Sequence, residues 1–230
     1  MEERGGYGQF CPVAMASEIL CTRWTMLVLR ELLVGTTRFN DLRRGVPRMS
    51  PALLSKRLKE LEKAGVVVAR PNTRGVMEYR LSEAGQELGP IIISMGCWGQ
   101  RWIDSEITLR NLDPSLLMWD IRRNLDPTPM PDRRCTIQFQ YSDLPESRRN
   151  WWLVIEDGKV DLCYYDPGHE IDLLVRGPLR SMTAVWMGLT SLPREVDEGN
   201  LEIDGEPSLA CSMQKWLGAS TFAKEPRRAV

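Results

Sequence analysis

The stretch from Met49 to Leu81 restricts the fold of this 230-residue chain more than any other stretch. Its first half carries apolar residues at helical intervals: Met49, Leu54, Leu58 and Leu61. This spacing predicts an amphipathic helix, because residues three and four positions apart share one face. Ser50 is suited to cap the start of this helix with Pro51 at its first position, and Gly65 is suited to end it.

The opposite face of the predicted helix is small, polar and basic. Its residues are Ala52, Ser55, Lys56, Lys59 and Lys63. Small side chains allow a helix to approach the base edges of a major groove, and lysines bind phosphates. A face of this kind is typical of a helix that binds DNA.

A β-ribbon is predicted directly after the helix. Residues 66–70 are rich in β-branched side chains, residues 71–75 have the composition of a turn, and residues 76–81 alternate between apolar and polar. Arg70 and Arg74 fall near the tip, where they could reach the sugar-phosphate backbone. A helix followed by such a hairpin is the arrangement of a winged helix.

Positive charge is concentrated in this part of the chain. Residues 36–80 hold 11 Lys and Arg against 4 Asp and Glu, a net charge of +7, whereas the whole chain has a net charge of -1. The alternative is a solvated helix and hairpin on any α/β protein, but the local charge favours binding of double-stranded DNA. The predicted DNA-binding residues are Arg38, Ser50, Pro51, Ala52, Ser55, Lys56, Lys59, Arg70 and Arg74.

Helical patterns flank this unit on both sides. Three shorter helices are predicted before it, near residues 12–21, 24–34 and 37–46. The helix predicted after the ribbon is apolar over more than half of its surface: Leu88, Ile91, Ile92, Met95, Trp98, Trp102 and Ile103. Such a helix needs a partner. We expect a second copy of the chain, because DNA-binding modules of this kind generally pair, and burial against another domain is the alternative.

A dense series of short motifs covers residues 11 to about 105. The motifs are Cys11-Pro12-Val13, Arg23-Trp24, Leu27 to Leu32, Arg38 to Leu42, Met49-Ser50-Pro51, Gly65-Val66-Val67 and Glu78 to Gly85. This pattern resembles the HxlR family of bacterial winged-helix transcription regulators. The resemblance implies a cytoplasmic homodimer with residues 50–64 as recognition helix and 66–81 as wing. It also implies that Cys11 could sense oxidants or electrophiles. Among the neighbouring residues, Arg23 could lower the pKa of this thiol. A buried, inert Cys11 is the alternative.

Composition and prolines divide the chain into segments, for which we predict an α+β fold with two domains. Residues 1–105 carry a net charge of +4 and the remainder -5, a sign difference that suggests two modules. The segments are a disordered N-terminus (1–10), a winged-helix domain for DNA binding and dimerisation (11–105), a helical and proline-rich linker (106–131), a second, mixed α/β domain (132–223) and a tail (224–230).

The second domain shows four strand patterns, a helix, a short strand and a last helix. This order, with landmarks at Gly158-Lys159-Val160, at Asp172-Leu173 and from Gly199 through Ile203-Asp204-Gly205, is similar to the sterol carrier protein 2 (SCP2-like) domain. The resemblance implies an apolar tunnel for a lipid or another hydrophobic small molecule. The ligand-binding candidates are Trp152, Tyr164, Trp186, Met187 and Trp216. The alternative is that these side chains fill a plain core.

The sequence gives little support to catalysis or to metal binding. The 6 cysteines form no CxxC pair, and the sequence has a single histidine, His169. It contains no nucleophile-elbow, metalloprotease or phosphate-binding-loop motif. We therefore expect no enzyme, no metal and no cofactor. The N-terminus lacks the apolar run of a signal peptide, and no stretch reaches the ~20 apolar residues of a membrane helix.

The resulting interpretation is a dimeric DNA-binding regulator whose second domain binds a hydrophobic effector. One alternative is a thiol switch at Cys11. The other is a lipid-binding protein that uses its winged helix for assembly.

Overall fold

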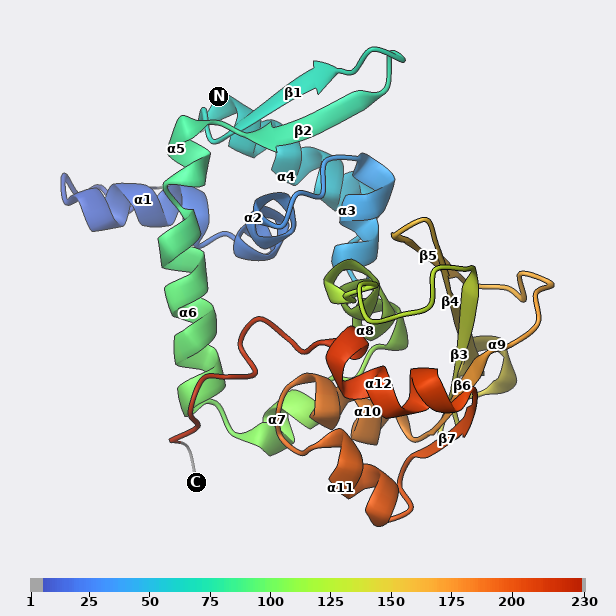
Figure 1. Ribbon diagram of the computed structural model, residues 1–230. Helices are drawn as coiled ribbons and strands as arrows, with labels where there is room; N and C mark the ends of the chain where they lie inside the picture. Colours follow the sequence, from blue (N-terminus) through green and yellow to red (C-terminus); the bar gives the residue numbers. More distant parts are fainter. Residues whose placement is uncertain (1–5, 229–230) are drawn as a thin grey trace. The chain divides into compact units, whose positions relative to one another are not determined.

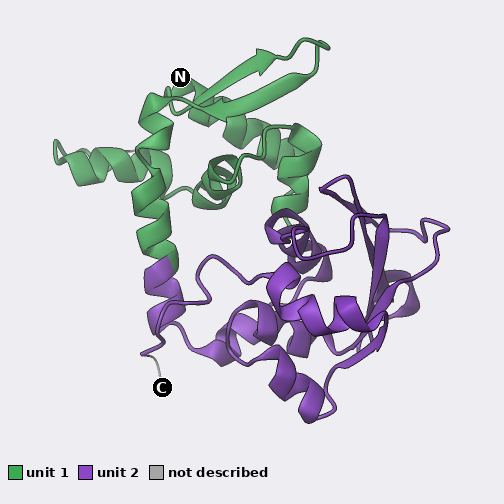
Figure 2. Ribbon diagram, in the orientation of Figure 1, with its two compact units in different colours: residues 1–96 green, residues 97–230 purple. Residues whose placement is uncertain are grey.

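The computed structural model describes residues 6–228, and the chain divides into two compact units, residues 1–96 and 97–230 (Figures 1 and 2). We call them unit 1 and unit 2. Among the described residues, no helix has the length and apolar character that crossing a membrane requires. Of the predicted disordered N-terminus, residues 1–5 lie outside the described residues, and residues 6–10 form neither helix nor strand.

Unit 1 has the predicted order of helices followed by a ribbon. Its elements are α1 (Pro12–Leu20), α2 (Thr25–Leu33), α3 (Phe39–Gly45), α4 (Pro51–Lys63), β1 (Val67–Pro71), β2 (Met77–Leu81), α5 (Glu83–Gln86) and the first turns of α6 (Gly89–Trp102). Strands β1 and β2 are antiparallel, and an isolated bridge joins Arg38 to Glu78 on the other side of β2. The segment before α3 therefore pairs with the free edge of β2 at this one position.

Helix α4 is held in unit 1 by its apolar stripe. Leu54, Leu58 and Leu61 are at most 1% exposed, as their spacing predicted. Burial of each leucine contributes about 1.5–3 kcal/mol to stability. The predicted ends are also confirmed: the hydroxyl of Ser50 accepts the amide of Leu53 at 3.3 Å, and Gly65 has a φ of 74° just beyond the helix.

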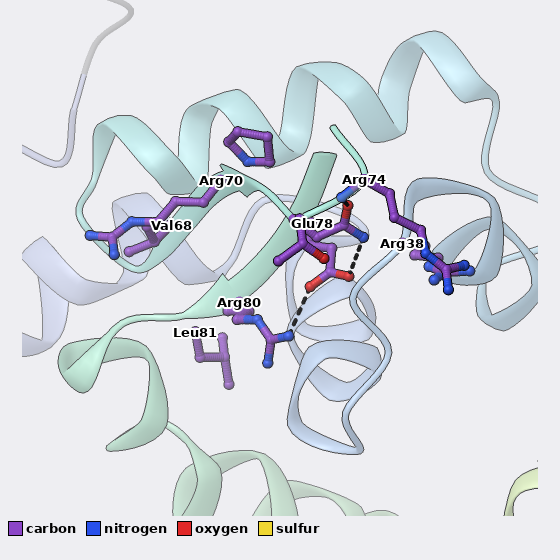
Figure 3. A pocket seen from close by; sticks show the side chains of 10 residues that line it. Arg38, Val68, Arg70, Arg74, Glu78, Arg80 and Leu81 are labelled. Atoms are coloured by element: carbon purple, nitrogen blue, oxygen red, sulfur yellow. Dashed lines mark hydrogen bonds and ion pairs between the residues drawn. The ribbon is translucent and has the colours of Figure 1, made fainter. Parts of the chain in front are cut away.

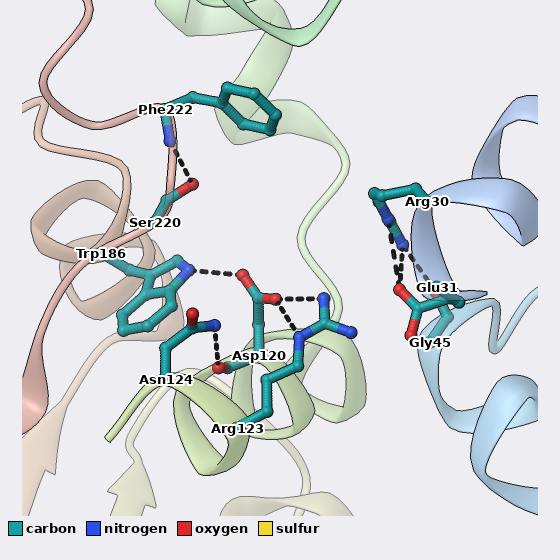
Figure 4. A network of polar contacts seen from close by, with 9 residues as sticks. All are labelled: Arg30, Glu31, Gly45, Asp120, Arg123, Asn124, Trp186, Ser220 and Phe222. Carbon is teal, nitrogen blue, oxygen red and sulfur yellow. Dashed lines mark hydrogen bonds and ion pairs between the residues drawn. The ribbon is translucent and has the colours of Figure 1, made fainter. Parts of the chain in front are cut away.

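A buried ion pair fixes the contact between α2 and α3. Glu31 is fully buried, and its carboxylate accepts Arg30 Nη2 at 2.8 Å. The same Nη2 donates to the carbonyl of Gly45 at 2.9 Å (Figure 4). A Cβ atom at position 45 would lie 2.0 Å from Glu31 Cδ, so only glycine fits there.

Unit 2 is a five-stranded sheet with helices. Its elements after α6 are α7 (Ser105–Arg110), α8 (Pro114–Asn124), β3 (Cys135–Tyr141), α9 (Glu146–Arg149), β4 (Asn150–Glu156), β5 (Lys159–Cys163), β6 (Leu173–Gly177), α10 (Leu179–Trp186), α11 (Leu192–Asp197), β7 (Glu202–Gly205) and α12 (Pro207–Leu217). The strand order is β5-β4-β3-β6-β7, with β3 and β6 parallel and the other pairs antiparallel. The predicted succession of four strands, helix, short strand and last helix is present.

The segment 106–131 is not a bare linker, which corrects the expected division of the chain. Asp113 caps α8, and its side chain accepts the amide of Ser115 at 3.0 Å. However, Leu117, Met118 and Ile121 of α8 belong to the core of unit 2. An amphipathic helix has to bury its apolar side, so the prolines after α8 mark a turn within a unit and not a domain boundary.

The described part of the predicted tail, residues 224–228, makes contacts with the end of α6. Glu225 forms an ion pair with Arg101 of α6 at 2.8 Å, and Arg227 donates to the carbonyl of Ile103 at 2.6 Å. The guanidinium of Arg228 lies 5.9 Å from the ring centre of Trp102. The described part of this segment is therefore attached to the end of α6, while residues 229–230 lie outside the described residues.

Candidate nucleic-acid interface

A first hollow lies on the outer face of α4, on the side opposite its apolar stripe. It has a volume of about 430 Å³ and is lined by Ala52, Ser55, Lys56, Lys59, Glu60 and Lys63. Helical spacing brings these residues together because they recur every three to four positions. The hollow thus contains four of the predicted DNA-binding residues, together with Lys63 at the end of the same face.

A second hollow lies on the wing, which we define as β1, β2 and the turn between them. Its volume is about 790 Å³, and it is lined by Arg38, Val68, Arg70, Pro71, Asn72, Thr73, Arg74, Glu78, Arg80 and Leu81 (Figure 3). Arg70 is the cross-strand partner of Glu78. On the other side of β2, the backbone of Arg38 forms an isolated β-bridge with that of Glu78. The structure therefore collects Arg38, Arg70 and Arg74 around one surface.

Basic side chains of unit 1 fall into two classes by their partners. Arg57 and Arg80 are neutralised by Glu60 and Glu78. Arg57 is moreover buried, so its predicted contribution to the basic surface is turned inward. Among the described residues, eight other cations of unit 1 form no ion pair. Two of them, Arg23 and Arg43, line neither hollow, and the remaining six are Arg38, Lys56, Lys59, Lys63, Arg70 and Arg74. All six line one of the two hollows.

Two predicted DNA-binding residues have a different position. Ser50 and Pro51 are exposed at the start of α4 but line neither hollow. The hydroxyl of Ser50 is engaged in capping the helix. Sequence reasoning missed the polar contacts of Asn72 and Glu78, for which the asparagine in the predicted turn was the available signal.

Glu78 is the acidic member of the wing hollow. Asn72 Nδ2 donates to its Oε1 at 3.0 Å, and Arg80 Nη2 donates to its Oε2 at 2.8 Å. These hydrogen bonds, that from Asn72 first, hold the pKa of Glu78 below its usual value, because they stabilise the carboxylate form. Glu78 is therefore charged at neutral pH in the midst of four arginines.

The five ligand-binding candidates of unit 2 occupy different places. Trp186 and Trp216 are buried in the core. The indole N–H of Trp186 donates to Asp120 (Figure 4), and that of Trp216 donates to the carbonyl of Leu209. Met187 packs against the same core, whereas Tyr164 is partly exposed and meets Trp151 edge to face at 5.2 Å.

Trp152 lies on the other face of the sheet. Its cross-strand partners are Gln138 and Cys163, whereas the adjacent Trp151 pairs with Phe139 in the core. Successive strand residues point to opposite faces, so the five candidates do not line one cavity. The indole nitrogen of Trp152 is buried and has no hydrogen-bond partner within the described part of the chain.

The cysteines are all free thiols, and Cys11 is exposed at the start of α1. Arg23, which the sequence offered as its cationic neighbour, instead places its guanidinium 5.6 Å from the ring centre of Trp24. Burial raises the pKa of the Cys97 thiol, and a hydrogen bond to Glu225 raises it further. The described residues include no group of three or more His, Cys, Asp and Glu side chains that could hold a metal ion.

Comparison with known proteins concerns mainly the first half of the chain. Residues 19–107 match the family described as HxlR-like helix-turn-helix. The chain is 39% identical over 99 residues to YvaP, an uncharacterized HTH-type transcriptional regulator of Bacillus subtilis (strain 168); the match covers 42% of this chain and 92% of YvaP. It is 34% identical over 138 residues to the uncharacterized HTH-type transcriptional regulator Rv3095 of Mycobacterium tuberculosis (strain ATCC 25618 / H37Rv), covering 52% and 85% of the two chains.

Among solved structures, the reduced form of the transcriptional regulator YodB from B. subtilis shares 29% identity with this chain. The match has a TM-score of 0.37 and covers 42% of this chain and 98% of YodB. Two findings identify the family of the first half of the chain. One is the sequence identity over nearly the full length of YvaP, and the other is the match of residues 19–107 to the family. The chain belongs to the HxlR-like helix-turn-helix family of transcriptional regulators.

Proposed function

We propose that this regulator places α4 in the major groove of double-stranded DNA and the wing against the adjacent sugar-phosphate backbone. Ala52 and Ser55 would face base edges, while Lys56 and Lys59 bind phosphates. Arg38, Arg70 and Arg74 bind phosphates or the minor-groove edge from the wing hollow. Ser50 and Pro51 contribute by fixing the start of α4.

The observation that supports this proposal is the sorting of charges in unit 1. Six cations without an acidic partner line the two hollows, where Arg80 is the one paired cation, and the paired Arg57 is buried outside them. An unpaired cation on the surface can release counterions from DNA, while a paired one has to give up its partner first. Each phosphate contact adds about 0.9 to the slope of log affinity against log salt.

The test is removal of one lysine. We expect Lys56→Ala to weaken binding to duplexes of many sequences and to lower the salt slope by about one. Fluorescence anisotropy at several salt concentrations measures both quantities. Lys159→Ala, an exposed lysine of unit 2, is the matched control and should leave the slope unchanged. An unaltered slope for Lys56→Ala excludes a phosphate contact at this position.

We also propose that the chain acts as a homodimer through α1 and α6. No residue of α1 is buried, and Val13 and Met15 are 73% and 58% exposed. On α6, Ile91, Met95 and Trp98 are exposed as well. Apolar surface of this extent is typical of a protein interface, and paired modules read two half-sites. Analytical ultracentrifugation tests the proposal, which a monomer at micromolar concentration would contradict.

A hydrophobic effector bound by unit 2 is the proposed means of regulation. It is supported by the order of elements, which is similar to that of an SCP2-like domain. Because Trp186 and Trp216 fill the core, an effector has to displace side chains or bind beside Met187 and Tyr164. Native mass spectrometry of the chain purified from its host, followed by organic extraction, tests this: one hydrophobic molecule per subunit supports it, and a clean apo protein argues against it.

The exposed thiol of Cys11 supports a second mode of regulation. In this mode an oxidant or electrophile modifies Cys11 and changes DNA binding. Treatment with diamide should then release DNA from the wild-type chain but not from Cys11→Ser. An equal response of the two proteins would exclude Cys11 as the sensor.

A further inference from the structure

Glu78 lines the wing hollow, where a carboxylate is electrostatically unfavourable for DNA binding. It is flanked across the strands by Arg70 and Arg38, and Arg80 follows two residues later on the same face. A negative charge on a phosphate-binding surface repels DNA. The side chain of Glu78 is only 16% exposed, so its two oxygens are directed into the wing and not toward solvent.

Each carboxylate oxygen of Glu78 has its own partner. Oε1 accepts Asn72 Nδ2 at 3.0 Å, and Oε2 accepts Arg80 Nη2 at 2.8 Å (Figure 3). The carboxylate thus joins the turn of the wing to the far end of β2. Charge-assisted hydrogen bonds of this kind are stronger than neutral ones.

Asn72 in turn fixes the backbone that carries Arg74. Its Oδ1 accepts the amides of Arg74 at 2.9 Å and of Val76 at 3.1 Å. Gly75, with a φ of 74°, completes the turn. The orientation of the Asn72 amide that gives these contacts depends on Glu78, because only an acceptor at that position can bind Nδ2 while Oδ1 faces the turn.

We propose that Glu78 is a positioning residue for DNA recognition: it orients Asn72, which fixes the tip carrying Arg74, and it binds Arg80, so that Arg38, Arg70 and Arg74 remain free for the backbone of DNA. This inference rests on the proposed function of the wing. It assigns to Glu78 no contact with DNA. It predicts that Glu78 raises specific binding although its charge lowers non-specific binding.

The first measurement concerns the wing alone. Amide hydrogen exchange of the full chain is compared for wild type, Glu78→Ala, Asn72→Ala and the control Glu87→Ala, an exposed acid outside both hollows. We expect exchange at Arg74 and Val76 to be accelerated about tenfold in the first two variants and unchanged in the control. Unchanged exchange in Glu78→Ala overturns the positioning role. Glu78→Gln retains an acceptor and serves as the variant that keeps the fold intact.

The second measurement separates specific from non-specific binding. A duplex selected by the wild-type chain from a random library is compared with a random-sequence duplex of the same length. We expect Glu78→Ala to bind the selected duplex about tenfold more weakly, the effect of losing one charge-assisted contact, and the random duplex equally or more tightly. Glu78→Gln should be intermediate, and Glu87→Ala should leave the ratio unchanged.

One result would contradict the positioning role of Glu78, and another would contradict the proposed binding of DNA. If Glu78→Ala binds both duplexes more tightly by the same factor, Glu78 is a mere repulsive charge and the inference is wrong. If the wild-type chain shows no salt-dependent binding to any duplex, the proposed function fails, and the role of Glu78 in recognition fails with it.

Discussion

Three arginines of the wing hollow in unit 1 and three arginines of unit 2 differ in their partners. In unit 2, Arg133 contacts Asp172 and Glu206, Arg176 contacts Glu202, and Arg194 contacts Glu198. In unit 1, by contrast, Arg38, Arg70 and Arg74 line a hollow without any such ion pair among the described residues. Exposed pairs contribute only about 0–1 kcal/mol to stability, so pairing in unit 2 is of minor energetic value. The difference lies in availability: the three arginines of the wing hollow have no acidic partner to give up before they bind a polyanion.

Reversing charges on α4 should have the largest effect on DNA binding and so test this comparison most strongly. We expect Lys56→Glu together with Lys59→Glu to weaken duplex binding about 100-fold or more, because two phosphate contacts are lost and two repulsions are added. Filter binding at low salt measures the loss. The double variant Lys159→Glu and Lys215→Glu in unit 2 makes the same charge change and should bind nearly as wild type. Equal losses in both would mean that net charge alone governs binding.

The buried pair of unit 1 should show the next largest effect. Gly45→Ala places a methyl group against Glu31, and we expect it to lower the free energy of unfolding by about 2–3 kcal/mol. Denaturation in urea measures this. In a Glu31→Ala background the same substitution should cost less, because the clash is removed. Additive effects of the two substitutions would contradict the contact.

An exposed pair of unit 2 should have a small effect. We expect Arg176→Ala to change the free energy of unfolding by less than ~1 kcal/mol. Arg176 Nη1 lies 3.1 Å from Glu202 Oε2, but both side chains are exposed to solvent, which weakens the ion pair. The salt slope of DNA binding should not change. A lower slope for Arg176→Ala would extend the nucleic-acid interface into unit 2 and abolish the contrast.

Protonation of Glu78 should give the smallest effect. Its pKa is lowered in the folded chain, so its contribution to stability is present above the unfolded pKa and is lost as pH falls through the folded pKa. Thermal unfolding of wild type and Glu78→Gln should therefore differ at neutral pH and converge in acid. A constant difference across pH would argue against the contacts with Asn72 and Arg80.

The helix and wing were predictable because their patterns are periodic and local. Leucines at helical intervals define the buried side of α4, and the lysines on its outer face follow from the same geometry. What the pattern cannot show is the partner of a charged side chain. Arg57 counts toward the basic surface in the sequence, but in the structure it is buried beside Glu60.

The second unit was predictable in the order of its elements and less so in its interior. Trp151 and Trp152 are neighbours in the sequence, and only the strand register places Trp151 in the core and Trp152 on the other face. A shift of one residue would exchange them. The assignment of α8 to a linker failed for a related reason, because the prolines after it end a helix without ending a domain.

Attachment of the C-terminal segment to α6 has a consequence for the order of folding. The hydrogen bonds from Arg101 to Glu225 and from Arg227 to Ile103 each span 124 residues of sequence. Non-local contacts form slowly, and domains fold from the N-terminus as the ribosome synthesises them. Unit 1 can thus be complete while the end of α6 still awaits Glu225. The nascent chain passes through a stage in which its helix-turn-helix is formed and its second unit is not.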